Sequence, residues 1–320
     1  MAPRSPVLES LLAPQSEPGY GTPGRSAWLD VDWDAHRQRA TVDGSSMEYV
    51  DIGSGPAMVF VHGLGACWQT WLENLPHFAR SHRCIALDLP GFGASGPVDG
   101  EISVERFARN VKDLLAHLEI DRCVLLGNSM GGFIALETAI RYPALVDRLV
   151  LVSAAVLWQE YRHAKPLVVF AQVTESTLGR AIVGSEPALI RRPKLRAAAL
   201  GFGGIRFPHL LSPELQCEIL LTARRTDAFL PALKALASYS LRDELEAVAC
   251  PTLIVWGTED SLVGVRHAIE LEQLIPDARK SLYERSGHVV MLERPERFNR
   301  EVEAFAAEDA SDLVGPAAVL

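Results

Sequence analysis

The sequence predicts an α/β fold in which helices cover both faces of a mostly parallel sheet and a helical cap is inserted into the chain. Short, continuously apolar runs alternate with segments of helical periodicity, a pattern typical of parallel strands that are buried on both faces. The alternation stops between residues 156 and 248, where helical pieces and several prolines replace it, and it resumes at Pro251. We therefore expect a core of residues 31–155 and 249–308 with a helical cap over residues 156–248.

The two ends of the chain lie outside this pattern. Residues 1–30 contain prolines and glycines but no apolar run of the kind a secretory signal needs, so we predict a flexible N-terminal arm. Residues 309–320 are expected to form a C-terminal tail.

The strands and helices can be placed along the chain from local signals. Two extended runs flank Asp43-Gly44, which predicts a β-hairpin. The hairpin and the buried strands are expected at residues 38–42, 46–52, 57–61, 84–87, 123–126, 149–152, 251–256 and 280–284. Helices are expected over residues 68–80, from Ser103 as N-cap, and over 133–140, 263–274 and 295–307.

Composition excludes several classes of function. The net charge of the 320 residues is −9, which argues against a nucleic-acid partner because no basic face can dominate. The five cysteines contain no C-x-x-C pair and show no metal-ligand spacing with histidine, so we expect a reducing, cytoplasmic environment, no metal and no cofactor. No apolar run reaches the length of a membrane span, so we expect no integral membrane segment.

A sharp corner between a strand and a helix is the strongest chemical signal. An apolar run ends in Gly127-Asn128-Ser129-Met130-Gly131, and a helical pattern begins directly after it. This G-x-S-x-G sequence between a strand and a helix is the nucleophile elbow, in which glycines allow close backbone approach and the serine hydroxyl projects at a strand end. We predict Ser129 as the nucleophile.

A serine nucleophile needs a base, and the base needs a carboxylate. His288 follows the last predicted strand, in the late position that the chain order Ser, Asp, His demands. The acid lies just past the preceding strand, where Asp260 is our choice and the adjacent Glu259 competes with it. The residues alone barely separate these two carboxylates.

Two backbone amides should stabilise the oxyanion of the reaction. Met130 directly follows the nucleophile, and Leu64 lies in the loop after the strand that ends at His62. We interpret His62 itself as a loop-shaping residue that takes no part in proton transfer.

One further motif could be mistaken for a nucleotide site. Residues 91–96 fit G-x-G-x-x-G after a strand, but Pro97 follows and the next helix begins only near Ser103. No helix N-terminus would therefore meet a pyrophosphate, which argues against dinucleotide binding.

Together these motifs resemble the ordered landmarks of the α/β-hydrolase superfamily, and the resemblance covers about residues 46–155 and 249–306. The landmarks are His62 to Gly65, Asp88 to Ser95, Gly127 to Gly132, Trp256 to Asp260, and Ser286 to His288. The resemblance implies the α/β-hydrolase fold, and the superfamily's G-x-x-D signature places the acid at Asp260. The residues around Ser129 also resemble those of the meta-cleavage-product hydrolases, which break carbon–carbon bonds in dienoic diketo acids.

The broadest interpretation is a serine esterase, lipase-like, that cleaves carboxylic esters with apolar acyl or aryl groups through an acyl-enzyme. The apolar cap favours such substrates, and Trp68, Trp158 and Val289 are candidate pocket residues. Two alternatives stay open: a carbon–carbon hydrolase of the meta-cleavage type, and a non-enzymatic ligand receptor on the same fold. The expected partner is a small ester, and the sequence leaves open a homodimer.

Overall fold

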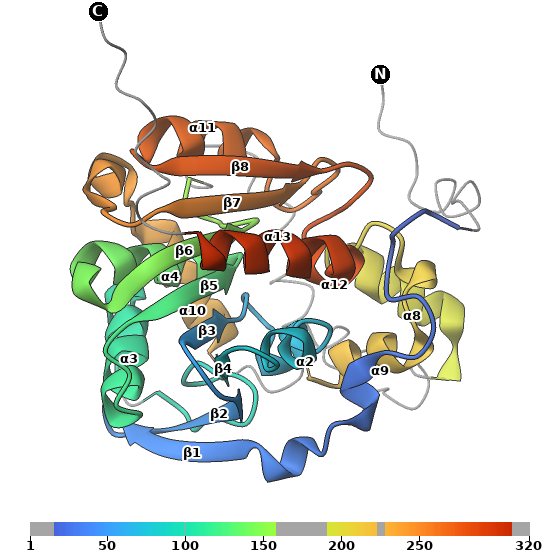
Figure 1. Ribbon diagram of the computed structural model, residues 1–320, viewed down its shortest axis with the longest axis horizontal. Helices are drawn as coiled ribbons and strands as arrows, with labels where there is room; N and C mark the ends of the chain where they lie inside the picture. Colours follow the sequence, from blue (N-terminus) through green and yellow to red (C-terminus); the bar gives the residue numbers. More distant parts are fainter. Residues whose placement is uncertain (1–15, 99, 158–190, 223–227, 309–320) are drawn as a thin grey trace, which may run out of the picture.

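The computed structural model describes residues 16–98, 100–157, 191–222 and 228–308, and its centre is one eight-stranded sheet (Figure 1). The strand order is β1-β2-β4-β3-β5-β6-β7-β8. Strand β2 is antiparallel to β1 and to β4, and every other neighbouring pair is parallel. The strands are β1 Arg37–Val42, β2 Ser45–Gly53, β3 Ala57–Val61, β4 Arg83–Leu87, β5 Cys123–Asn128, β6 Val146–Val152, β7 Thr252–Gly257 and β8 Ala278–Tyr283.

Helices cover both faces of the sheet. The described α-helices are α2 Leu75–Phe78, α3 Val104–His117, α4 Met130–Arg141, α8 Pro193–Phe202, α9 Pro213–Thr222, α10 Phe229–Ser238, α11 Arg266–Leu274, α12 Val290–Glu293 and α13 Pro295–Ala307. Short 3-10 turns lie at η1 Ala27–Asp30, η2 Trp33–Ala35, η3 Trp68–Trp71, η4 Pro143–Leu145, η6 Pro208–Leu210 and η7 Arg242–Ala247. Among these described helices, none combines the length and the apolar character that crossing a membrane requires.

The central strands are continuously apolar because alternate side chains enter two different cores. In β3, Val59 and Val61 pack in the core with residues of α3 and α4, whereas Met58 and Phe60 pack in the core on the opposite face. The Phe60 ring lies 5.9 Å from that of Phe78 in α2. This two-faced burial confirms the predicted fold class.

One predicted helix is wrong. Residues 68–80 do not form a single helix but divide into η3 and α2. Pro76 explains the break, because proline has no N–H for a hydrogen bond four residues back and is tolerated in a first helical turn. It is the second residue of α2, so a new helix begins where the old one would have continued. The short helix α12 was not predicted.

The described part of the predicted arm, residues 16–30, is packed against the body and is not free. Trp28 in η1 is 8% exposed, and its indole N–H donates to the Glu73 carboxylate over 3.0 Å. The hydroxyls of Thr22 and Ser26 donate to the same carboxylate over 2.6 and 2.7 Å. Residues 1–15 and the predicted tail, 309–320, lie outside the described residues.

The described parts of the insertion are helical, as predicted. Helices α8, α9 and α10 and the turns η6 and η7 lie between β6 and β7 along the chain. In Figure 1, α8 and α9 group beside the N-terminal residues at one side of the sheet. The predicted cap residues 158–190 and 223–227 lie outside the described residues.

Candidate active site

The elbow has the predicted strand, corner and helix. Strand β5 ends at Asn128, Ser129 adopts φ 55° and ψ −114°, and α4 begins at Met130. Such a backbone conformation is strained for a residue other than glycine and costs about 1–3 kcal/mol. A Cβ on Gly131 would lie 2.2 Å from the Val61 carbonyl oxygen, so only glycine lets α4 begin this close to β3.

The structure brings the predicted base and acid together. His288 Nδ1 lies 2.8 Å from Asp260 Oδ2, and the two side chains are 6% and 0% exposed. Asp260 Oδ1 accepts two further hydrogen bonds, from the amides of Leu262 and Val263, both over 2.9 Å. Because the carboxylate accepts the Nδ1 proton, Nε2 of a neutral His288 carries a free lone pair and can act as a base.

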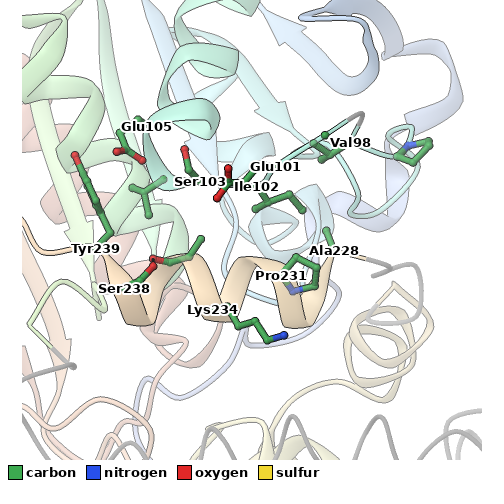
Figure 2. Close-up of a pocket in the computed structure, with 14 residues that line it drawn as sticks. Val98, Glu101, Ile102, Ser103, Glu105, Ala228, Pro231, Lys234, Ser238 and Tyr239 are labelled. Atoms are coloured by element: carbon green, nitrogen blue, oxygen red, sulfur yellow. Dashed lines mark hydrogen bonds between the residues drawn. The ribbon is translucent and has the colours of Figure 1, made fainter.

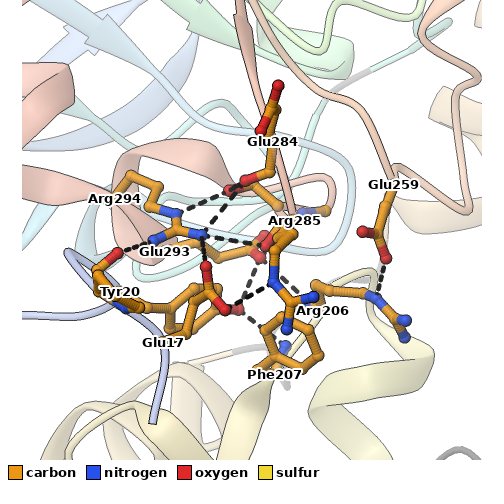
Figure 3. A network of polar contacts seen from close by, with 12 residues as sticks. Glu17, Tyr20, Arg206, Phe207, Glu259, Glu284, Arg285, Glu293 and Arg294 are labelled. Carbon is orange, nitrogen blue, oxygen red and sulfur yellow. Dashed lines mark hydrogen bonds and ion pairs between the residues drawn. The ribbon is translucent and has the colours of Figure 1, made fainter. Parts of the chain in front are cut away.

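Glu259, the competing acid, lies elsewhere. Its carboxylate forms an ion pair with Arg206 of the cap (Figure 3). The side chains of this pair are 31% and 37% exposed. The geometry therefore separates the two adjacent carboxylates that the residues alone left undecided.

The strand end that carries Ser129 is tied to the base. Asn128 Nδ2 donates to the carbonyl oxygens of Val152 and His288, both over 3.2 Å. The Ser129 amide donates to the same Val152 oxygen over 2.9 Å. Strands β5, β7 and β8 run parallel, so Ser129, Asp260 and His288 all follow carboxyl ends of strands at one edge of the sheet.

Of the two predicted oxyanion donors, Met130 follows the nucleophile in the chain, and Leu64 belongs to a loop that passes close to Ser129. A Cβ built on Gly63, the neighbour of Leu64, would lie 3.2 Å from Ser129 Cβ. Met130 is the first residue of α4, where backbone amides have no helical acceptor and the helix dipole is positive. The roles of Leu64 and Met130 as oxyanion donors stay predictions.

His62 shapes this loop by hydrogen bonding, as interpreted from the sequence. Its Nε2 accepts the Leu89 amide over 3.1 Å, so Nδ1 carries the proton and donates to the Gly63 carbonyl over 2.8 Å. Burial lowers the pKa of His62 to about 4. The ring is therefore neutral at pH 7 and links the Leu64 loop to the segment that follows β4.

The three candidate pocket residues have different outcomes. Trp68 is 3% exposed, its ring lies 5.1 Å from that of Trp33, and its amide donates to Asp88, so it packs in a core. Val289 is half-buried beside the same core. Trp158 lies outside the described residues.

A cavity of about 790 Å³ lies between α10 and residues 97–98 and 100–105 (Figure 2). Glu101, Glu105, Lys234 and Tyr239 are among its lining residues, whereas Ser129, Asp260 and His288 are not. The cavity therefore differs from the predicted catalytic site, although Ala228 at its edge precedes Phe229, whose ring covers Gly65.

Two residues at the site were missed by sequence reasoning. The Gly204 carbonyl of the cap accepts the His288 amide over 2.8 Å, and a Cβ on Gly204 would lie 2.7 Å from His288 Cβ. Glu293 is fully buried and accepts the amides of Gly287 and Val289, on either side of the base. The signal for Glu293 was a carboxylate at the end of the apolar run 289–292.

Comparison with known proteins identifies the class of protein that this fold and site define. Residues 58–301 match the model of the alpha/beta hydrolase family, so the chain belongs to that family. The chain is 32% identical over 284 residues to an uncharacterised protein of Mycobacterium tuberculosis, a match that covers 84% of this chain and 80% of the relative.

Two further proteins have named activities. A 2-hydroxy-6-oxo-2,4-heptadienoate hydrolase of Pseudomonas putida is 31% identical over 274 residues, which cover 81% of this chain and 92% of that protein. The crystal structure of an esterase from Rhodococcus sp. ECU1013 is similar with a TM-score of 0.66 and 25% identity, covering 85% of this chain and 99% of the esterase.

Proposed function

We propose that this protein is a serine hydrolase that cleaves carboxylic esters with apolar acyl or aryl groups. The observation that carries the proposal is the 2.8 Å contact between His288 Nδ1 and the buried Asp260 carboxylate, at the sheet edge where Ser129 occupies the strained elbow. This contact leaves Nε2 of His288 as the basic nitrogen beside a serine nucleophile.

The reaction takes two steps. His288 Nε2 accepts the Ser129 Oγ proton while Oγ attacks the acyl carbon, and the amides of Leu64 and Met130 stabilise the oxyanion, each contributing about 3 kcal/mol in the transition state. The leaving alkoxide takes the proton from His288 and departs as an alcohol. His288 then accepts a proton from water, which attacks the acyl-enzyme, and that proton returns to Ser129 as the carboxylic acid leaves.

The apolar substrate preference is supported by what the cap places over the site. The Phe229 ring covers Gly65 in the Leu64 loop, and a Cβ on that glycine would lie 2.9 Å from the ring. Gly204 of the cap lies against the base, and a Cβ on it would lie 2.9 Å from the Leu262 side chain of the core. Aromatic and aliphatic walls of this kind favour apolar groups over sugars. The similarity to the Rhodococcus esterase supports the same proposal.

Carbon–carbon hydrolysis is the second candidate, and the 31% identity to the Pseudomonas heptadienoate hydrolase favours it. A direct comparison separates the two functions: the purified protein is given p-nitrophenyl acetate, butyrate and octanoate in one series and 2-hydroxy-6-oxo-2,4-heptadienoate in another. We expect higher kcat/KM for the esters. A higher kcat/KM for the dienoate would replace the esterase proposal with the second candidate.

The nucleophile is tested by substitution and by labelling. Ser129→Ala should lower kcat by a factor on the order of 10⁴ or more and abolish the mass increase caused by a fluorophosphonate. Ser281→Ala is the matched control. Ser281 lies on the same sheet as the strand that precedes Ser129, and its hydroxyl donates to Glu301, so the variant should retain turnover and labelling. Ester turnover by Ser129→Ala at the wild-type rate would contradict the assignment.

A further inference from the structure

We propose that Glu293 and Tyr20 are positioning residues for His288. The buried Glu293 carboxylate fixes the loop that contains His288, here called the loop of the base, to the cap and to the N-terminal segment 17–21. This inference rests on the proposed function, because it concerns the residue assigned there as the base. Neither side chain is placed at the reacting atoms. Both act through the backbone on each side of His288.

The Glu293 carboxylate accepts hydrogen bonds from the backbone amides of both residues that flank His288. Oε2 accepts the Gly287 amide over 2.8 Å, and Oε1 accepts the Val289 amide over 3.3 Å. Asp260 fixes the ring of His288 through Nδ1, so the ring and the main chain are held by two different carboxylates. The two amide bonds hold the main chain on both sides of the ring.

The same carboxylate reaches the cap. Oε2 also accepts the Arg206 amide over 3.1 Å, and the His288 amide donates to the Gly204 carbonyl over 2.8 Å. The loop of the base and the cap segment 204–207 are therefore cross-linked by hydrogen bonds in both directions. A shift of the cap segment would move the backbone of His288.

Tyr20, near the N-terminus, adds a further contact to the Glu293 carboxylate (Figure 3). Its hydroxyl donates to Glu293 Oε2 over 2.6 Å and accepts the Phe207 amide over 2.8 Å. The Tyr20 ring lies 5.5 Å from the Phe207 ring, and the Arg294 guanidinium lies 5.0 Å from the tyrosine ring. The hydroxyl thus joins the buried carboxylate to the cap segment by one continuous chain of hydrogen bonds.

The segment 17–21 is itself anchored, so Tyr20 is held in place. Glu17 pairs with Arg285 over 2.6 Å and with Arg294 over 3.2 Å, on either side of the loop. The Gly21 amide donates to the Glu293 carbonyl over 2.8 Å. Figure 3 shows the Glu17 carboxylate paired with the guanidinium groups of both Arg285 and Arg294.

The full burial of Glu293 makes the tyrosine hydroxyl important. Burial raises the pKa of the Glu293 carboxyl, and the hydrogen bonds from Tyr20 and from the amides of Gly287, Arg206 and Val289 act against this rise. Loss of the tyrosine hydroxyl removes the one side-chain donor and leaves the Phe207 amide without its acceptor. The carboxylate must then rearrange, and the loop of the base moves with it.

The test compares Tyr20→Phe with Tyr239→Phe. Both changes delete a hydroxyl that donates to a buried glutamate, but Tyr239 bonds Glu137 in α4 and not the loop of the base. We expect Tyr20→Phe to lower kcat for p-nitrophenyl butyrate about tenfold with KM changed less than about twofold, because a misplaced base affects chemistry and not uniform binding. The apparent pKa of the kcat/KM profile should also move. Tyr239→Phe should leave all three unchanged.

Two further measurements keep the outcomes separate. The low-field Nδ1–H proton resonance of His288 should shift in Tyr20→Phe and in Glu293→Gln, and it should not shift in Tyr239→Phe. If Tyr20→Phe lowers the melting temperature but leaves kcat, the pH profile and this resonance unchanged, the contacts are only structural and the inference is overturned. A wild-type protein that neither hydrolyses esters nor reacts with a fluorophosphonate would instead overturn the proposed function, whatever the resonance shows.

Discussion

His62 is a fully buried histidine whose two ring nitrogens are both used by the backbone around the elbow. Burial lowers its pKa to about 4, whereas the pKa of a histidine in the unfolded chain is about 6.5. Below that value the unfolded chain binds a proton that the folded protein does not. The free energy of unfolding should therefore fall as the pH drops from about 6.5 to about 4, by up to about 3 kcal/mol from this residue.

His62→Gln should reduce the slope of the unfolding free energy against pH by the equivalent of about one bound proton. It should also lower the unfolding free energy at pH 7 by about 1–3 kcal/mol, because the hydrogen bond to Leu89 is lost. The measurement is urea unfolding at a series of pH values between 7 and 4. His117→Gln, on the exposed end of α3, is the control and should keep the wild-type slope. An unchanged slope in His62→Gln would contradict the assignment of a neutral buried ring.

The positions of single candidate residues were predictable where a local pattern fixes them. The G-x-S-x-G corner fixed Ser129, and the position after a strand pointed to His288. Glu293 was not predicted because its hydrogen bond with Tyr20 joins residues that are 273 positions apart in the chain. Asp260 and Glu259 could not be separated by their own chemistry, because both are acids in one loop and only the fold decides which meets His288.

The elbow depends on the close packing of α4 against β3. Gly131→Ala would place a methyl group 2.2 Å from the Val61 oxygen and 2.5 Å from the His62 oxygen, so α4 and β3 must separate. We expect a loss of about 1–3 kcal/mol in unfolding free energy, together with slower fluorophosphonate labelling. Urea unfolding and mass spectrometry measure the two effects.

The matched variant is Gly264→Ala, because a Cβ there meets no atom within 4 Å. It should change the unfolding free energy by less than about 0.5 kcal/mol and leave labelling unaltered. Equal effects of the two alanines would show that backbone freedom, and not the close approach of α4 to β3, explains the glycine at 131.

Helix α3 offers a simpler test of local structure. Ser103 was predicted as its N-cap, and the Ser103 hydroxyl accepts the Arg106 amide over 3.2 Å. Ser103→Ala should lower the unfolding free energy by about 1 kcal/mol, and Ser103→Asp should restore it. Thermal unfolding followed by circular dichroism gives both values, and an unchanged stability in the alanine variant would show that the hydroxyl contributes nothing.

Elements were predictable to the extent that their signals are local. The hairpin around Asp43-Gly44 and helix α13 follow from turn chemistry and apolar spacing, and both were found as predicted. The helix expected over residues 68–80 shows the limit of periodicity, because Pro76 outweighs the apolar pattern. Helix α12 is a single turn whose residues are held by tertiary contacts, so the sequence shows no helical periodicity that would predict it.

At the scale of the whole molecule, the N-terminal residues act as an outer layer that is held by polar contacts. Thr22, Ser26 and Trp28 all donate to Glu73, on the segment between η3 and α2. Glu73→Ala removes all three acceptor contacts at once. We expect amide hydrogen exchange to rise about tenfold or more in residues 22–31 and to stay unchanged in the central strands β3 to β7.

Glu272→Ala is the control for this exchange experiment. It removes the contacts of a different carboxylate with Lys280 in β8, on the opposite side of the sheet. Exchange in residues 22–31 should then keep its wild-type rate. If Glu73→Ala also left those residues protected, the apolar burial of Trp28 alone would account for their order.

The packed N-terminal segment also shows why composition misled the prediction. Prolines, glycines and polar residues usually indicate a chain that cannot bury enough apolar surface to order itself. Here the order comes from elsewhere, because Glu73, Glu293 and Arg294 supply partners that lie far along the sequence. Polar contacts between residues far apart in the chain produce no periodic pattern in the sequence, whereas a strand or an amphipathic helix does.

The anchoring of Tyr20 on Glu293 has a consequence for the timing of protein synthesis. At about 5–20 residues per second, a ribosome needs roughly 15–55 seconds to add the 273 residues that separate the two. During the later part of that interval, after residue 129 has been added, the growing chain carries its elbow serine but has no Glu293 for Tyr20 to bind. The contact between Tyr20 and Glu293 can therefore form only after translation has passed residue 293, so this N-terminal segment is fixed in place late in synthesis.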